Sequence, residues 1–121
     1  MSYHQDWLMR QIEAISTMLA YLLSGKVPSH ILITEQEATT GEENLLLLQL
    51  QALTHQNRVC EAENLLFEAL EEPSRQVLDA ANWFYSHLNG WTDQQLTQCD
   101  FSREEIMSGL QEVCKVFGIP I

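Results

Sequence analysis

The sequence predicts an all-α fold, a single-domain bundle of five to six helices in 121 residues. Three observations predict this class. Apolar residues recur at intervals of three and four through most of the chain, which is the period of amphipathic helices. Capping residues precede these stretches, and glycine or proline follows them. Only residues 31–33 suggest a strand, and they do so weakly.

The first helix is expected to run from Asp6 to Ser24, because Gly25 supplies a stop. Its apolar stripe covers only about two heptads, fewer than a free-standing coiled coil requires. We therefore expect the stripe to dock on the protein's own core, with a homodimer seam as the alternative. The stripe consists of Leu8, Ile12, Ile15, Leu19 and Leu22.

Residues 42–72 are expected to form two antiparallel helices joined by a polar turn at residues 55–57. Six leucines between Leu45 and Leu53 point almost all the way round the first of these helices. A helix that is apolar on all sides is usually buried. The sequence therefore predicts that this hairpin is the core and that the other helices pack on it.

Cap residues mark the starts of the later helices. A capping box, in which Ser or Thr is followed three residues later by Glu, is predicted twice. The fourth helix is expected to end near Leu88, a short turn is expected at residues 93–96, and the last helix carries an apolar stripe from Ile106 to Phe117. The expected N-caps are Thr40 with Glu43, which starts the second helix at Gly41 or Glu42, then Asn57, Ser74, and Ser102 with Glu105.

Residues 26–40 are expected to form an ordered crossover between the first and second helices. A connection of this length is long for a compact domain, and such connections are often functional or mobile. Two roles stay open. Ile31, Leu32 and Ile33 fill the open end of the bundle, or the segment gates a binding site.

The formal charge of −11 is unevenly distributed. Residues 35–72 hold nine acids against one base, so this third of the chain carries −8. Such a surface repels nucleic acid and anionic lipid, and it favours either solubility or a basic partner. No signal peptide or membrane span is expected, because the apolar run at residues 18–23 is far too short.

No catalytic residue, metal site or cofactor is predicted. Three cysteines without CxxC spacing are typical of reduced thiols in the cytoplasm. The histidines lack the short pair spacings of zinc sites, and neither a nucleophile elbow nor a phosphate-binding loop is present.

Two stretches carry family resemblances. Ala62, Leu66, Ala69 and Pro73 have nearly the spacing of one tetratricopeptide repeat, and the 42–72 hairpin resembles such a unit. A single repeat cannot form the groove with which repeat arrays bind peptides, so this resemblance implies packing only.

The second resemblance rests on residues 6–13, DWLMRQIE, the stretch 19–26, and residues 61–68, EAENLLFE. These motifs are similar to those of a family of small all-helical proteins from Gram-positive bacteria without an assigned activity. The resemblance implies a cytoplasmic helical bundle, and it supplies no catalytic residues.

Glu63 has an unexpected position for a charged residue. Helical geometry places it between Phe67 and Leu70, on the flank of the third helix's apolar face. Two interpretations stay open: an edge residue whose carboxylate reaches water, or a buried polar anchor. The anchor would pair with a base or a backbone amide of the crossover or the first helix.

The fourth helix contains three consecutive aromatic residues that fan over about 200°. Two of them are expected in the core, with Trp83 at the rim. Because interfaces are enriched in Trp and Tyr, the candidate interface residues are Trp7, Trp83, Tyr85 and Trp91.

These features favour a non-enzymatic helical interaction or structural module that self-associates as a homodimer or binds another protein. The alternative is a small-molecule-binding regulator with an apolar pocket between helices. An exposed apolar patch would favour a protein partner, whereas an enclosed apolar cavity with a few polar groups would favour a ligand.

Overall fold

The computed structural model describes residues 3–24 and 44–120, which form six helices and no strand. The predicted all-α class is confirmed. The crossover, Ile31 to Ile33 and the Thr40–Glu43 capping box lie outside the described residues. The helices are α1 (Tyr3–Leu23), α2 (Leu45–His55), α3 (Val59–Ala69), α4 (Arg75–Asn89), α5 (Asp93–Gln98) and α6 (Arg103–Val116).

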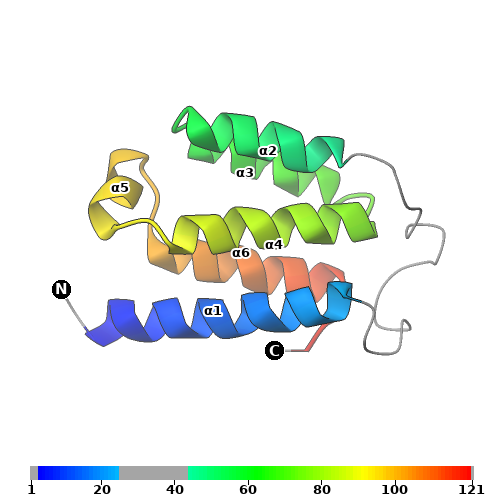
Figure 1. Ribbon diagram of the computed structural model, residues 1–121, viewed down its shortest axis with the longest axis horizontal. Helices are drawn as coiled ribbons and strands as arrows, with labels where there is room; N and C mark the ends of the chain where they lie inside the picture. Colours follow the sequence, from blue (N-terminus) through cyan, green and yellow to red (C-terminus); the bar gives the residue numbers. More distant parts are fainter. Residues whose placement is uncertain (1–2, 25–43, 121) are drawn as a thin grey trace.

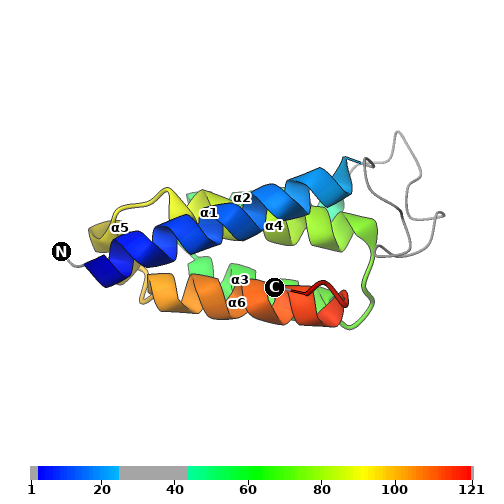
Figure 2. The same cartoon turned by 90° about the horizontal axis from the view of Figure 1, so that it is seen from below.

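The helices form two layers, with α4 in the middle. Figures 1 and 2 show α2, α4 and α1 side by side in one layer and α3 and α6 in the other, while α5 lies across one end. Helix α4 packs against α1, α2 and α6, and less extensively against α3. Its fully buried side chains include Leu78, Ala81, Phe84, Tyr85 and Leu88. The centre of the fold is therefore α4, while the 42–72 hairpin supplies part of the core without being the element on which all the other helices pack.

Helix α2 lies at the edge of its layer. Leu45 is 65% exposed and Leu48 is 47% exposed, while Leu50 and Thr54 are buried. Among the described helices, α2 packs closely against α3 and α4 alone, and some of the leucines that point all round it lie at the surface. Its start also differs from the prediction, since Asn44 caps it by accepting a hydrogen bond from the Leu47 amide at 3.1 Å.

Helix α1 docks on α4 and α6 with the predicted stripe. Leu8, Ile12, Leu19 and Leu22 are buried, and Ile15 is partly buried. The docking prediction is confirmed. Because this stripe is covered by the chain's own helices, it is not available as a homodimer seam.

Polar side chains of α4 bind backbone carbonyls of α1 at three levels. Arg75 donates to the Leu23 carbonyl, Asn82 Nδ2 donates to Ser16 O at 3.3 Å, and Asn89 Nδ2 donates to the Met9 carbonyl at 3.1 Å. The order of these contacts shows that α1 and α4 are antiparallel. Side-chain donors of this kind fix the register of two helices as well as their distance.

The predicted caps are correct at two helices and wrong at a third. Ser74 and Ser102 each accept a hydrogen bond from the amide three residues later. Asn57 instead adopts a left-handed conformation with φ 63° in the turn, and Arg58 precedes α3 without a side-chain cap. Helix α5 has a capping box, Thr92 with Gln95, that the sequence analysis did not predict.

A buried arginine closes the end of the bundle near α5. Arg103 is 3% exposed. It donates to Asn89 O at 2.8 Å, Asn89 Oδ1 at 3.0 Å, Trp91 O at 2.9 Å and Asp93 Oδ1 at 2.8 Å. The guanidinium thus satisfies carbonyls at the negative end of α4, where a positive charge is favourable. Within the described residues, no helix is long and apolar enough to span a membrane.

Candidate functional site

The candidate site is the space between α3 and α6 in the second layer. These helices run in the same direction but are not closely packed against each other, and α4 lies behind both (Figures 1 and 2). Helical spacing places Glu63 and Phe67 on the flank of α3 that faces α6, and Glu71 lies in the turn that follows α3. We call the surface formed by Phe67, Leu70, Glu71, Glu112 and Val116 the α3–α6 groove.

Tyr85 of α4 contacts both α3 and α6 behind the groove. Its side chain is fully buried, and its hydroxyl donates to Glu63 Oε2 at 2.7 Å. A Cβ at position 109 would lie only 2.2 Å from this hydroxyl oxygen. Gly109 therefore leaves the space through which the phenol of α4 passes α6 to reach α3.

The carboxylate of Glu63 is held in an unfavourable electrostatic environment. Burial raises the pKa of Glu63, the hydrogen bond from Tyr85 lowers it, and the negative charge of Glu105 raises it further; the net shift is upward. Glu63 is thus a half-buried polar anchor, but its partner is a phenol of α4. The predicted partner was a base or a backbone amide of the crossover or the first helix, and the crossover lies outside the described residues.

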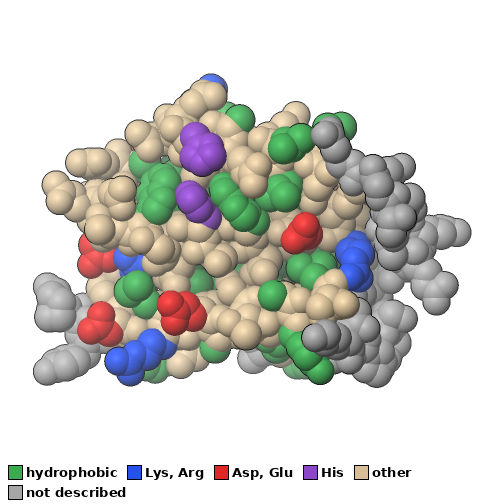
Figure 3. Space-filling view, in the orientation of Figure 1, with side chains coloured by type: hydrophobic (Ala, Val, Ile, Leu, Met, Phe, Trp, Pro, Cys, Tyr) green, Lys and Arg blue, Asp and Glu red, His purple; other side chains and the backbone are tan. Residues whose placement is uncertain are grey.

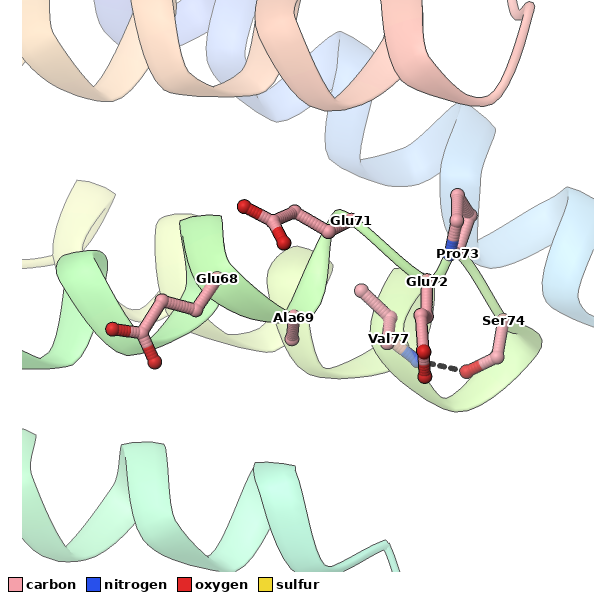
Figure 4. A pocket seen from close by; sticks show the side chains of 7 residues that line it. All are labelled: Glu68, Ala69, Glu71, Glu72, Pro73, Ser74 and Val77. Atoms are coloured by element: carbon pink, nitrogen blue, oxygen red, sulfur yellow. Dashed lines mark hydrogen bonds between the residues drawn. The ribbon is translucent and has the colours of Figure 1, made fainter.

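The groove itself combines apolar side chains with carboxylates. Phe67 and Val116 remain 39% and 36% exposed beside the buried Leu70, and Glu71 and Glu112 line the same hollow of about 490 Å³. Figure 4 shows the side chain of Glu71 directed toward α6, while Glu68 points to another side of α3. None of the described residues that line this groove is basic.

A second hollow, of about 570 Å³, adjoins the groove at the α3–α4 turn. Its wall includes Glu68, Glu71 and Glu72 together with Pro73, and the dashed bond in Figure 4 is the Ser74 cap of α4. Because Glu71 belongs to both hollows, the acidic surface continues from the groove around the end of α3.

Cys60 lies at the other end of α3, where its thiol is 3.8 Å from the Cys99 carbonyl oxygen. Burial and the neighbouring charges of Glu105, Glu63 and Asp100 raise the pKa of the Cys60 thiol. Burial raises the pKa of Cys114 to about 11. These shifts disfavour the thiolate form that nucleophilic or metal-binding cysteines require.

Three of the four candidate interface residues lie at the surface. Trp83 stacks on His87 with ring centroids 4.6 Å apart, and Trp91 meets the same histidine edge-on at 6.0 Å. Figure 3 shows histidine and hydrophobic side chains together on the face over α2 and α4. Trp7, on α1, is 55% exposed. Tyr85 is fully buried, so its assignment to an interface was wrong.

The aromatic face of Trp83, His87 and Trp91 also includes a histidine pair. His55 at the end of α2 lies 6.1 Å from His87, ring centroid to ring centroid. Burial and the proximity of His55 lower the pKa of His87. Among the residues that the structure describes, no group of three or more His, Cys, Asp or Glu side chains is arranged to hold a metal ion.

The flank position of Glu63 was predictable from the sequence, but the groove beside it was not. Phe67 and Val116 have an apolar character typical of the core, and only the separation of α3 from α6 leaves them exposed. Gly109 was the one residue in the sequence that indicated close packing here, because a glycine inside a helix lowers its stability and is usually kept where another side chain needs the space.

A model of a family of unknown function matches residues 2–118. No curated protein and no solved structure matches the chain. The family match is consistent with the uncharacterised helical family expected from residues 6–13 and 61–68. The bacterial source and the likeness to a tetratricopeptide repeat stay predictions.

Proposed function

The chain belongs to this family of unknown function, DUF6483, and from that premise we propose a non-enzymatic interaction module that holds a helix of a partner protein in the α3–α6 groove. One observation carries the proposal: Phe67 and Val116 remain exposed beside Leu70 in an open hollow between α3 and α6. Apolar side chains in such grooves serve elsewhere as the receptor surface for an amphipathic helix.

A protein partner explains this geometry better than a small molecule does. Ligand pockets usually enclose most of the ligand surface, and they are concave cavities lined mainly by apolar groups. Here the hollow is open to solvent and only five residues line it, of which two are glutamates. A small apolar ligand would remain largely in water, whereas a helix would cover the groove along its length.

The titratable residues of the site support a structural role. Glu63 receives the Tyr85 hydrogen bond, and the raised pKa of the Cys60 thiol disfavours a nucleophile at neutral pH.

Self-association through the aromatic face of Trp83 and Trp91 remains a second proposal, supported by the partial exposure of both side chains.

Three model peptides of about 18 residues test the groove, long enough to form several helical turns. They share one leucine pattern and carry Lys, Gln or Glu at every polar position. We expect at least one to bind in fluorescence anisotropy and to perturb the amide resonances of Phe67 and Val116. The double variant Phe67→Gln/Val116→Gln should abolish that binding.

The matched control is Leu45→Gln/Leu48→Gln, which removes two comparably exposed apolar side chains from α2. This variant should bind the peptides like the unaltered protein. If no peptide binds, or if the α2 variant loses binding as fully as the groove variant, the proposed function is wrong.

A further inference from the structure

The rims of the α3–α6 groove carry negative charge on both sides. Glu71, in the turn after α3, and Glu112 from α6 line its apolar part, and Glu63 on α3 and Glu105 on α6 continue the two rims toward the start of α3. Two of the four described arginines pair with carboxylates elsewhere, Arg58 with Glu61 and Arg103 with Asp93. Lys115 follows Glu112 by three residues on α6, but it is not among the residues that line the groove.

This charge is incompletely compensated within the protein. Glu105 raises the pKa of Glu63, so the two carboxylates repel each other across the space between α3 and α6. Glu105, Glu63 and Asp100 similarly raise the pKa of Cys60. A cation placed between the two helices would relieve this repulsion, and its attraction would be strengthened by the low dielectric of the adjoining core.

We infer that the partner segment is a cationic amphipathic helix, with apolar residues seated against Phe67, Leu70 and Val116 and Lys or Arg facing the carboxylates. The inference rests on the proposed function of the groove. It also excludes the chain's own copies as the preferred occupant, because each copy carries a net charge of −11. Phosphate-rich nucleic acid and anionic lipid would be repelled for the same reason.

The spacing of the carboxylates specifies where the cations should lie. Glu105 and Glu112 are separated by seven residues, about 10.5 Å along α6. On the opposite rim, Glu63 lies within α3 and Glu71 in the turn that follows it. A bound helix with basic residues about two turns apart would reach carboxylates at both ends of the groove.

The same three peptides test whether the partner helix is positively charged. At low ionic strength we expect the Lys peptide to bind about tenfold more tightly than the Gln peptide, and the Glu peptide to bind least. Raising the salt concentration should remove most of the preference for Lys, because screening weakens exposed charge pairs. A Lys peptide of the same composition with scrambled order should bind much more weakly.

Two charge variants test whether the preference for the Lys peptide comes from the carboxylates of the groove. Glu71→Gln/Glu112→Gln should bring the affinity for the Lys peptide close to that for the Gln peptide. The control Glu13→Gln/Asp79→Asn removes two exposed carboxylates from α1 and α4 and should leave the preference intact. Circular dichroism of each variant should confirm an unchanged helical content.

The outcomes separate this inference from the proposed function. If the Gln or Glu peptide binds the groove as tightly as the Lys peptide, the groove is an interaction site but its partner is not cationic. If the scrambled Lys peptide binds equally well, or if the control variant loses as much affinity as the groove variant, the attraction is to net charge and the inference is wrong. If no peptide responds to Phe67→Gln/Val116→Gln, both proposals are wrong.

Discussion

At the scale of single residues, Glu63 shows two opposing effects on one carboxylate. The Tyr85 hydroxyl donates to it at 2.7 Å, and this hydrogen bond favours the charged form. Burial and Glu105 favour the neutral form, and their combined effect is larger because the pKa is raised. The charged form of Glu63 is therefore held at a cost to stability.

A pH titration of stability tests this description of Glu63. The folded pKa lies above the ordinary value of 4.5, so protonated Glu63 contributes stability below that value, and the contribution is lost as pH rises through the folded pKa. We expect the unfolding free energy of the native protein, minus that of Glu63→Gln, to be larger at pH 4 than at pH 7. Urea denaturation of both proteins at each pH provides the measurement.

The control for this titration is Glu68→Gln on the exposed side of the same helix. The unfolding free energy of this variant is measured in the same way at both pH values. If the native protein's advantage in unfolding free energy over Glu63→Gln grows toward neutral pH, the hydrogen bond from Tyr85 outweighs burial and repulsion. If that advantage is the same at both pH values, the opposing effects cancel and the description is also wrong.

At the scale of helices, the distance between α4 and α6 depends on Gly109, which has no side chain. Ala is ordinarily better than Gly inside a helix by about 1 kcal/mol. At Gly109 this gain is opposed by overlap with the Tyr85 ring, whose Cζ would lie 2.3 Å from the new Cβ. The buried phenol is held by Glu63 on one side and by the core on the other, so it cannot move away freely.

Gly109→Ala is therefore expected to destabilise the protein by about 1–3 kcal/mol, the usual cost of overpacking a core. Urea denaturation monitored by circular dichroism measures the loss. Gly90→Ala is the matched control, because its Cβ would meet nothing closer than His87 O at 3.4 Å, and it should change stability by less than about 0.5 kcal/mol. In a Tyr85→Leu background the Gly109→Ala penalty should disappear, and its persistence there would contradict the steric explanation.

The helices themselves were predictable because their signals are local. Ser74 and Ser102 cap helices through amides only three residues away, and the stripe of α6 follows from spacing alone. The position of each helix in the bundle depends on contacts between distant segments. Six leucines in α2 therefore suggested a central helix, whereas the more polar α4, with Asn82 and Asn89 bonded to α1, occupies the centre.

The site was predictable only in part for the same reason. The flank position of Glu63 follows from the geometry of one helix. Its partner Tyr85 is 22 residues away on another helix, and the space for that contact comes from Gly109 on a third. No spacing rule within a single segment brings these three residues together.

At the scale of the whole molecule, two surfaces compete for the role of interaction site. The α3–α6 groove lies in one layer, and the aromatic face of Trp83, His87 and Trp91 belongs to α4 and the segment after it. Their expected partners differ in charge. A cationic helix is attracted by the net charge of −11, whereas a second copy of the chain is repelled by it.

The salt dependence of association should therefore have opposite signs at the two surfaces. We expect the chain alone to sediment as a monomer at low ionic strength, because electrostatic repulsion between copies is then strongest. Self-association through the aromatic face should increase as salt rises and should be lost in Trp83→Gln/Trp91→Gln, but kept in Tyr21→Gln, which alters an exposed aromatic residue of α1. Sedimentation equilibrium at several salt concentrations measures this directly. A dimer that is stable at low salt and dissociates at high salt would show that ion pairs join the copies, and it would exclude the aromatic face as the seam.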